Sequence, residues 1–487
     1  MGMAKLRRRK LLKTGGAVAL AALAAGAGPT RNAAADDRPI KLRGRSPGAS
    51  VGALKVEPLQ PDKAGILDLP KGFTYRIVQR AGERMSDGYR LPGRPDAMGC
   101  FAGPSGSLIL MRNHEVFEGD TGISPYFPGQ TAPPEAYDPA GTGGVTRVVL
   151  DAQTLQVRRS NLVLAGTYWN CAGGLSPWGW LSCEETLSPD HGYVFLCSTD
   201  ADSVRKAEPI PAYGRMRHEA ATVDPKTLIA YLTEDEGDSC FYRFVPTHRE
   251  KPFLGMLQAL RIVGRPGHDT GEQRPGARLP VEWVNIDDPA ATPNTIRAQG
   301  HAKGAAQVRR GEGLWHAGNE VFFSATAGGP LGRGQVLRLS LGAKPTLEVI
   351  AESTDLEQLD MPDNLCVSPH GLLYVAEDGL NGNFLRRISP NGSMVAFGRN
   401  AASLSEFAGP CFSPDGQTLF VNIQVDGLTL AIRGPFEREL EVERATSLDH
   451  SGEAQPSWAR GARGLGGGLA VLALAAISRR RNLRARE

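Results

Sequence analysis

Short apolar segments separated by turn residues recur along most of the chain. Each copy has the pattern of a hairpin, in which a turn rich in Pro, Gly or Asp joins two runs of β-branched and aromatic residues. No amphipathic helical pattern of useful length lies between the copies, and this favours a radial β architecture over a parallel α/β sheet. Six copies are identified by their turns, which are GPSG at 103–106, SPWG at 176–179, DPK at 224–226, HAGN at 316–319, SPHG at 368–371 and SPDG at 413–416.

The six copies predict an all-β fold, a six-bladed β-propeller with insertions between blades, over residues 36–438. One domain is expected, because no Ser/Gly-rich or charged linker interrupts Ile66–Gly434. The copies are unevenly spaced, so we expect insertions at Thr121–Ala140 and Arg249–Gly304. A β-sandwich with coincidental turns of this kind is the alternative.

The two strands of a hairpin are antiparallel, so the start of the first and the end of the second lie at the same end of each copy. In a propeller these ends surround the central channel, and one rim is expected to gather carboxylates, side-chain amides and one thiol. Only the fourth copy, which ends at Ser324–Thr326, supplies no acid to this rim. The starts are placed at Met98-Gly99, Asn170-Cys171, His218-Glu219, Gly304, Asp363-Asn364 and Glu406, and the ends at Asn113–Glu115, Glu184-Glu185, Glu234-Asp235, Glu377-Asp378 and Asn422–Gln424.

Carboxylates that face one another in a cleft raise each other's pKa unless cations lie between them. The rim therefore predicts bound Ca²⁺, Mg²⁺ or Fe³⁺, which prefer oxygen ligands. Cys171 adds a soft ligand, and this favours a transition metal beside the hard cations. The alternative is that acids at strand ends are ordinary solvated turn residues, and for His114 and His218 a structural and a ligating role are equally open.

The formal net charge of +3 hides an acidic body. Residues 1–35 contribute seven positive charges and residues 479–487 a net four, so the remainder carries −8. An acidic body argues against a protein that binds nucleic acid. The seven cysteines are odd in number and include no CxxC pair, so neither a disulfide framework nor a structural zinc site is expected.

The amino terminus has the pattern of a twin-arginine export signal. Arg8-Arg9 precedes an apolar stretch at Ala17–Ala27, and Ala33–Ala35 form an Ala-x-Ala cleavage site. We expect residues 1–35 to be removed and the protein to act in the periplasm, at the cell surface or in the medium. An ordinary Sec signal is the alternative.

The carboxyl terminus has the pattern of a sorting or membrane tail. A polar linker at 439–463 precedes a segment at 464–487, which is Gly-rich and apolar and contains the arginine cluster Arg479–Arg481. The apolar run is short for a full membrane span, which needs ~20 residues. A disordered or loosely membrane-attached tail is the alternative.

Six segments of the body resemble the PhoX alkaline phosphatase family, and the block NCAGG…CEE is specific to it. The resemblance covers most of the folded body and implies a twin-arginine-exported, six-bladed propeller that hydrolyses phosphomonoesters with two ferric ions and several calcium ions. The segments are RNHE at 112–115, NCAGGLSPWGWLSCEE at 170–185, GRMRHEAA at 214–221, LTEDEGD at 232–238, MPDNL at 361–365 and EFAGPCFSPDGQTLFVNIQ at 406–424.

The resemblance also implies a set of metal ligands. Cys171 would be the thiolate on iron, Glu185, Glu234 and Glu377 the acids shared between iron and calcium, and Asn113, Glu115 and Glu219 further calcium ligands. The choice between adjacent acids, Glu184 or Glu185 and Glu377 or Asp378, stays open. The turn before WLSCEE is one residue shorter than is usual in the family, and this puts the position of that strand end in doubt. The candidates for binding phosphate are Arg147, Arg217 and Arg243.

We therefore predict a metal-dependent alkaline phosphatase that acts outside the cytoplasm on small phosphorylated substrates. Its expected partners are the twin-arginine export machinery and, through the tail, the membrane, and the protein is expected to be a monomer. One alternative is another metal-dependent propeller hydrolase, such as a lactonase, which usually needs a single cation. The other is a non-enzymatic propeller that serves as a binding platform. The sequence assigns no catalytic residue and no natural substrate.

Overall fold

The computed structural model of the protein describes residue 54, residues 57–290 and residues 295–436. The predicted signal at 1–35, the linker at 439–463 and the tail at 464–487 lie outside the described residues. Among the residues that are described, no helix is both long and apolar enough to cross a membrane.

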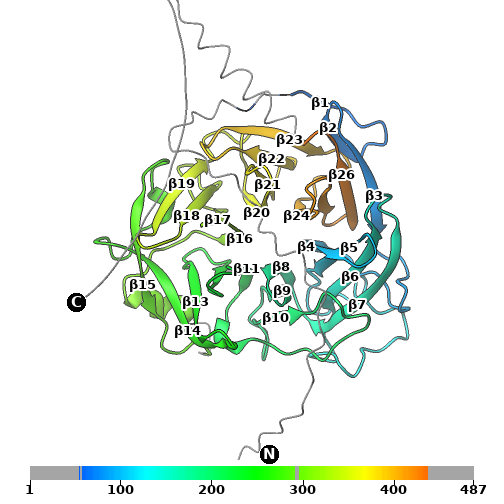
Figure 1. Cartoon of the computed structure of the whole chain (residues 1–487), viewed down its shortest axis with the longest axis horizontal. Helices are drawn as coiled ribbons and strands as arrows, with labels where there is room; N and C mark the ends of the chain where they lie inside the picture. Colours follow the sequence, from blue (N-terminus) through cyan, green and yellow to red (C-terminus); the bar gives the residue numbers. More distant parts are fainter. Residues whose placement is uncertain (1–53, 55–56, 291–294, 437–487) are drawn as a thin grey trace, which may run out of the picture.

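The strands form five hydrogen-bonded sheets arranged around a centre (Figure 1). One sheet has the order β4 (Pro95–Gly103), β5 (Ser107–His114), β6 (Gly143–Asp151) and β7 (Val157–Thr167), and the next has the order β8 (Asn170–Ser176), β9 (Gly179–Glu184) and β10 (Val194–Cys197). A nine-stranded sheet follows, in the order β11 (His218–Val223), β12 (Ala230–Glu234), β13 (Tyr242–His248), β14 (Lys251–Ile262), β15 (Leu279–Asn285), β19 (Thr346–Glu352), β18 (Gln335–Ser340), β17 (Glu320–Ala325) and β16 (Gly311–Ala317).

The last two sheets contain strands from both ends of the described chain. One has the order β1 (Leu59–Gln60), β2 (Leu67–Pro70), β23 (Met394–Asn400), β22 (Phe384–Ile388), β21 (Leu373–Glu377) and β20 (Pro362–Val367). The other has the order β24 (Phe407–Phe412), β25 (Leu419–Ile423), β26 (Leu428–Arg433) and β3 (Thr74–Arg80). The pairing of β3 with β26 joins an early strand to the last one and so closes the ring (Figure 1).

The fold is an all-β, propeller-like arrangement. Its innermost strands β4, β8, β11, β16, β20 and β24 each contact the next in a closed ring. The predicted count of six blades is not confirmed, because the pairing of β15 with β19 merges strands into one nine-stranded sheet and leaves five sheets. The helices among the described residues are short: α1 (Ile296–Ala302), η1 (Pro211–Tyr213) and η2 (Thr270–Glu272).

Two expectations about the strands need correction. The fourth hairpin does not start at Gly304, because its first strand β16 begins at Gly311. Arg249–Gly304 is not a single insertion either, since it contains β14, β15 and α1. Thr121–Ala140 does hold no strand, as expected of an insertion.

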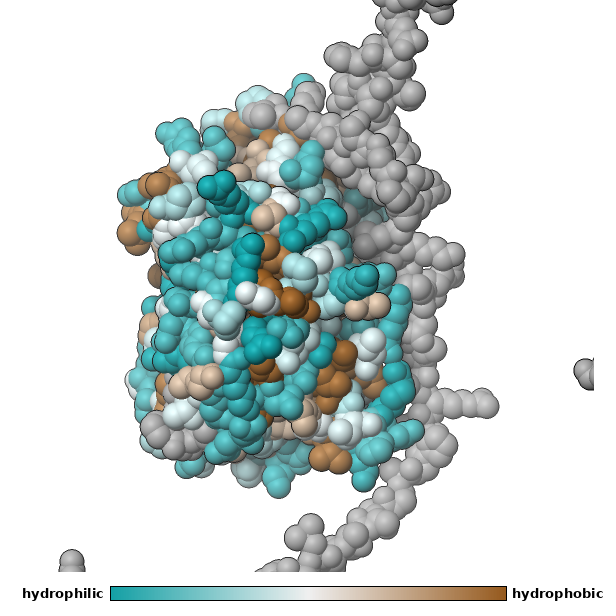
Figure 2. All heavy atoms as spheres, turned by 90° about the vertical axis from the view of Figure 1, so that its left-hand side faces the viewer, coloured by the Kyte–Doolittle hydropathy of each residue, from teal (hydrophilic) through white to brown (hydrophobic). Residues whose placement is uncertain are grey.

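Large apolar side chains fill the space between neighbouring sheets, and Trp180, Tyr242, Phe323 and Phe420 are almost completely buried. The outside is different. Figure 2 shows the edge of the ring that lies on the left in Figure 1, where hydrophilic residues dominate and apolar residues form small, separate spots. The core is therefore divided among the interfaces between sheets, and the centre of the ring is left to other side chains.

A β-bulge interrupts every innermost strand near its start. The register shifts after Pro95 in β4, and the same shift occurs after the first residue of β8, β11, β16 and β20 and after the second residue of β24. A bulge places two residues opposite one and turns a side chain away from the regular alternation. The first bulged residues are Asp96, Cys171, Glu219, Glu312, Asp363 and Gly409.

Candidate metal centre

The bulges bring five acidic or thiol side chains together at one end of the central channel, and Glu115 and Glu185 join them. Three groups of side chains offer ligand atoms that all lie within 4.8 Å of one another. Cys171 belongs to two of these groups and so does Glu219, so the groups form one continuous cluster, here called the acidic ring. The groups are Asp96, Glu115 and Cys171; Cys171, Glu185 and Glu219; and Glu219, Glu312 and Asp363.

The carboxyl groups of the ring are difficult to ionise together. Burial raises the pKa of Asp96 to about 6 and that of Glu185 to about 8, and neighbouring carboxylates add to both shifts. Burial and neighbouring carboxylates also hold the pKa of Glu219 well above its usual range. The pKa values of the ring carboxyls Glu115, Glu312 and Asp363 are well above their usual range for the same two reasons, and so is the pKa of Glu406, which is not part of the ring.

Cys171 and Glu219 lie at the centre of the ring. The thiol of Cys171 donates to Glu219 Oε1 over 3.4 Å, and burial followed by nearby carboxylates raises the pKa of this thiol. The other carboxylate oxygen, Glu219 Oε2, is buried and has no hydrogen-bond partner among the described residues. A buried carboxylate oxygen without a partner is costly, and a bound cation would satisfy it.

Few positive charges compensate the ring. Arg310 makes two bonds to Asp235, of 2.8 and 2.9 Å, and one of 2.6 Å to Glu312. The Arg217 guanidinium lies 3.8 Å from Glu185 at the rim. These arginines are outnumbered by the buried acids, so the donor set of one thiol and many carboxylates fits bound cations.

The structure brings together four of the seven predicted ligands: Glu115, Cys171, Glu185 and Glu219. Glu234 and Glu377 belong to none of these groups, and Asn113 lies beside the ring through its bond to the Cys171 carbonyl; all three side chains are held by protein groups. Asn113 donates to the carbonyls of Cys171 and Ala172 and accepts from Trp180 Nε1. Glu234 accepts from the Tyr242 hydroxyl and from Arg297, and Glu377 accepts from Arg386 and from the backbone of Asp360 and Phe384.

Alternation along the second strands separates the adjacent acids. Glu184 accepts a 2.6 Å bond from His191 Nδ1 and further bonds from backbone amides, while the next residue, Glu185, belongs to the ring. In the same way, Glu377 at the end of β21 accepts hydrogen bonds from Phe384 and Arg386 on the neighbouring strand β22. The charge of the next residue, Asp378, raises the pKa of Asp96 and of Glu406, so this carboxylate lies near the ring. The shortened turn before β9 has not moved Glu185 away from the cluster.

Sequence reasoning missed Asp96 and Glu312 and placed Asp363 and Glu406 on the rim without assigning them as ligands. The expectation that the fourth copy lacks an acid was wrong, because Glu312 lies near the start of β16. The sequence does contain a pattern from which the acids at the bulges could have been identified. Each acid or thiol at a bulge is the second residue of its strand and is followed by a small residue or Asn, as in PDA, NCA, HEA, GEG and PDN.

The two histidines have structural partners. His114 contacts the Gly93 carbonyl and the Thr146 hydroxyl through its two ring nitrogens. His218 Nε2 contacts the Gly214 carbonyl. Burial lowers the pKa of both side chains, which favours neutral imidazoles.

Of the three candidate arginines, only Arg217 lies beside the ring. Arg147 donates to the Thr199 carbonyl. Arg243 donates to Gln258 and stacks over Trp283, on strands away from the centre. Arg310, which sequence reasoning did not single out, lies closest to the buried acids.

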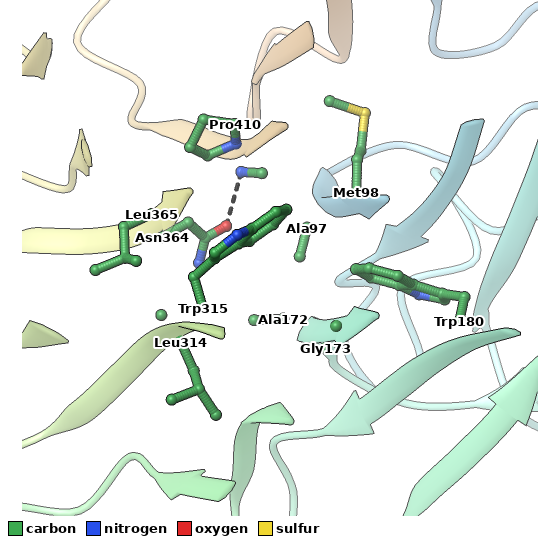
Figure 3. Close-up of a pocket in the computed structure, with 13 residues that line it drawn as sticks. Ala97, Met98, Ala172, Gly173, Trp180, Leu314, Trp315, Asn364, Leu365 and Pro410 are labelled. Carbon is green, nitrogen blue, oxygen red and sulfur yellow. Dashed lines mark hydrogen bonds between the residues drawn. The ribbon is translucent and has the colours of Figure 1, made fainter. Parts of the chain in front are cut away.

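A small cavity lies next to the ring. The residues that follow the bulges line a cavity of about 20 Å³, which is room for roughly one water molecule. Figure 3 shows Trp315, Ala172 and Pro410 around it, together with Asn364, which accepts a 2.7 Å bond from the Gly409 amide. This bond joins the bulge of β24 to the bulge of β20 and so helps to hold both in place.

Comparison with known proteins gives one matching family and several similar structures. A model of the family described as alkaline phosphatase PhoX matches residues 54–427. No curated protein matches the chain. A structure of Pseudomonas fluorescens PhoX in complex with vanadate, a transition state analogue, is 17% identical, with a TM-score of 0.60 over 79% of this chain and 98% of that one. A gluconolactonase from Xanthomonas campestris is 14% identical, with a TM-score of 0.36 over 74% of this chain and 100% of that one.

Proposed function

The chain belongs to the PhoX family of alkaline phosphatases and is a phosphatase, and we propose that it hydrolyses phosphate monoesters with metal ions held on the acidic ring. One observation carries the proposal: three overlapping groups of buried ligand atoms, each within 4.8 Å, meet at Cys171 and Glu219. The partnerless oxygen of Glu219 supports it, since a cation would satisfy that oxygen.

We also propose that the propeller has six blades. The nine-stranded sheet is then counted as two blades, which are joined by the pairing of β15 with β19.

The ligands proposed differ in hardness. Cys171 offers a thiolate, which suits Fe³⁺ beside carboxylates, whereas Asp96, Glu115, Glu312 and Asp363 offer oxygens alone, which suit Ca²⁺. Metal ions at such positions supply charge neutralisation for phosphate oxygens and an acidified water. Asn113, Glu234 and Glu377 then act as supports, because protein groups already occupy their oxygens.

The arginine side chains near the ring have a role separate from that of the metal ions. Arg310 is held by Asp235 and Glu312 beside the ring, and Arg217 lies at the rim with more than a third of its side chain exposed. A planar guanidinium can bind two phosphate oxygens at once, so Arg217 orients the phosphate of the substrate, and Arg310, whose Nε and Nη2 are bonded to Asp235 and Glu312, offers only its Nη1. The cavity lined by Ala172, Gly313 and Asn364 has room for roughly one water molecule, so a small phosphorylated substrate enters from the rim.

Phosphate release tests the proposal most directly. We expect the purified protein to release phosphate from p-nitrophenyl phosphate and to contain more than one metal ion per chain by elemental analysis. A lactonase would open lactones with a single bound cation and leave phosphate esters intact. A binding platform would turn over neither substrate. Either result from a fully metallated preparation would contradict the phosphatase proposal.

We further propose that the protein acts outside the cytoplasm, with Arg8-Arg9 as the address read by the twin-arginine export machinery. Replacing both by Lys keeps the charge but removes the paired arginines. We expect Arg8→Lys/Arg9→Lys to leave the protein in the cytoplasmic fraction, while Lys5→Arg, a control outside the pair, is exported normally. Export of the double variant at the normal level would instead favour the Sec pathway.

A further inference from the structure

Two half-buried aromatic side chains stack on each other beside the acidic ring. The ring centroids of Phe117 and Trp169 are 4.1 Å apart, and their planes are inclined by 31°. The guanidinium carbon of Arg94 lies 4.1 Å from the centroid of Phe117. Arg94, Phe117 and Trp169, here called the rim stack, therefore form one layered π system, and the proposed metal centre leaves it without a role.

The rim stack is built from the same segments as the acidic ring. Phe117 follows Glu115 by two residues, and Trp169 precedes Cys171 by two. The backbone carbonyl of Trp169 accepts a 2.9 Å bond from the amide of Glu185. Both aromatic side chains are thus fixed by segments that carry groups of the ring.

Arg94 has a direct polar connection to the ring. Its Nη1 donates to Gln424 Oε1 over 3.4 Å. The amide nitrogen of Gln424 in turn donates to Asp96 and to Glu115, over 2.8 Å in each case. The rim stack is therefore positioned at the mouth of the ring by packing and by hydrogen bonds.

The backbone at two of the three residues is unfavourable for a large side chain. Trp169 has φ of 49° and Arg94 has φ of 43°, both in the left-handed region. Glycine adopts this region without strain, whereas a bulky residue there costs free energy. Strained positions of this kind concentrate at functional sites. Arg310 and Met361, directly before β16 and β20, adopt the same conformation. What sets Arg94 and Trp169 apart is therefore their stacking with Phe117.

We propose that the rim stack binds flat aromatic leaving groups of phosphate monoesters. The inference rests on the proposed function: with the phosphate on the acidic ring, the leaving group extends toward the rim. Stacking recognises any flat π system, whether an aryl ring attached directly to the phosphate or a nucleobase carried on ribose. The enzyme therefore prefers aryl phosphates, nucleotides or both over esters of plain alcohols.

Two matched substrate pairs test the proposal in Trp169→Ala and in the wild type. Phenyl phosphate is compared with cyclohexyl phosphate, and adenosine 5′-monophosphate with ribose 5-phosphate, each as a ratio of kcat/KM. Such a ratio measures discrimination, and it does not depend on the fraction of active enzyme in a preparation. We expect at least one ratio to fall about tenfold in Trp169→Ala, the effect of losing one stacking contact.

Two further variants separate stacking from folding effects. Trp169→Gly relaxes the positive φ and removes the ring, so it should show the same loss of discrimination with a smaller loss of stability than Trp169→Ala. Trp283→Ala is the matched control, since Trp283 also stacks with an arginine, at 4.3 Å, but lies on the outer strand β15. Its two ratios should equal those of the wild type.

The outcomes are distinct. A fall in the phenyl ratio alone means that the rim stack reads a ring next to the phosphate, a fall in the adenosine ratio alone means that it reads the base, and a fall in both means that it reads either. Ratios that stay at the wild-type value in both Trp169 variants overturn the proposal. A wild-type protein that releases phosphate from none of the four esters would contradict the proposed function instead.

Discussion

Cys171→Ser is expected to lose the iron proposed for the acidic ring and to lower kcat/KM for p-nitrophenyl phosphate by at least about 100-fold, the upper end of the effects seen for residues that support metal ligands. Cys171 contributes to two of the three ligand groups, as does Glu219, so its thiol is one of the two most shared ligands. A hydroxyl is a harder and weaker charge donor than a thiolate and would not hold a transition metal in the same way. Iron per chain, measured together with activity, checks the prediction.

Cys183→Ser is the matched control for this experiment. Cys183 is completely buried in an apolar cluster on β9 and is not among the ring residues. Its replacement should cost ~1–3 kcal/mol of stability for an unsatisfied hydroxyl and leave the iron content unchanged. If Cys171→Ser kept its iron and lost only stability, as the control does, Cys171 would be a structural thiol and not a ligand.

The hairpin repeat and the ends of the second strands are readable from the sequence. The turns lie where Pro and Gly place them, and SPWG at 176–179 joins β8 to β9 as the pattern predicts. The rim acids Glu115 and Glu185 follow from this, because a second strand ends where its apolar run ends. The number of blades does not follow, since the pairing of β15 with β19 depends on contacts between distant segments.

The starts of the first strands are harder to predict, because the bulges there break the period of two. In a regular strand, the side chain of Asp96 would be assigned to a face by alternation with Met98 and Cys100. The bulge between Pro95 and Met98 removes that relation, and the side chain turns into the ring. Glu312 was missed for a second reason: α1 and the turn after it precede β16 and moved the predicted start to Gly304.

Pairs of adjacent acids show a different limit of prediction from the sequence. Sequence similarity identifies a pair such as Glu184 and Glu185 but not which member faces the centre. The structure separates them through hydrogen bonds that only the folded chain provides, such as the 2.6 Å bond from His191 to Glu184. Residue type alone predicts an acidic rim, and tertiary contacts decide which acids are free to bind cations.

Removing the metal ions with a chelator is expected to abolish activity and to make the stability of the protein strongly dependent on pH. Burial raises the pKa of Asp96 from 3.8 to about 6 and that of Glu185 from 4.5 to about 8. A carboxyl whose pKa is raised on folding stabilises the fold while it is protonated, and that stability is lost as the pH rises through the folded-state value. The window for this loss therefore runs from about pH 4, where the unfolded chain titrates, to about pH 8.

The expected loss is large, because each unit of pKa shift corresponds to ~1.4 kcal/mol and two such groups amount to several kcal/mol. Thermal unfolding of the metal-free protein should thus give a Tm that falls between pH 5 and pH 8. Added Ca²⁺ should remove most of that fall, since it neutralises the carboxylates of the folded state alone. Asp96→Asn/Glu185→Gln, which cannot ionise at these positions, should show a flatter dependence without metal. A metal-free wild-type Tm that stays constant over this window, or one that Ca²⁺ does not raise at pH 8, would mean that the ring is not a cation site.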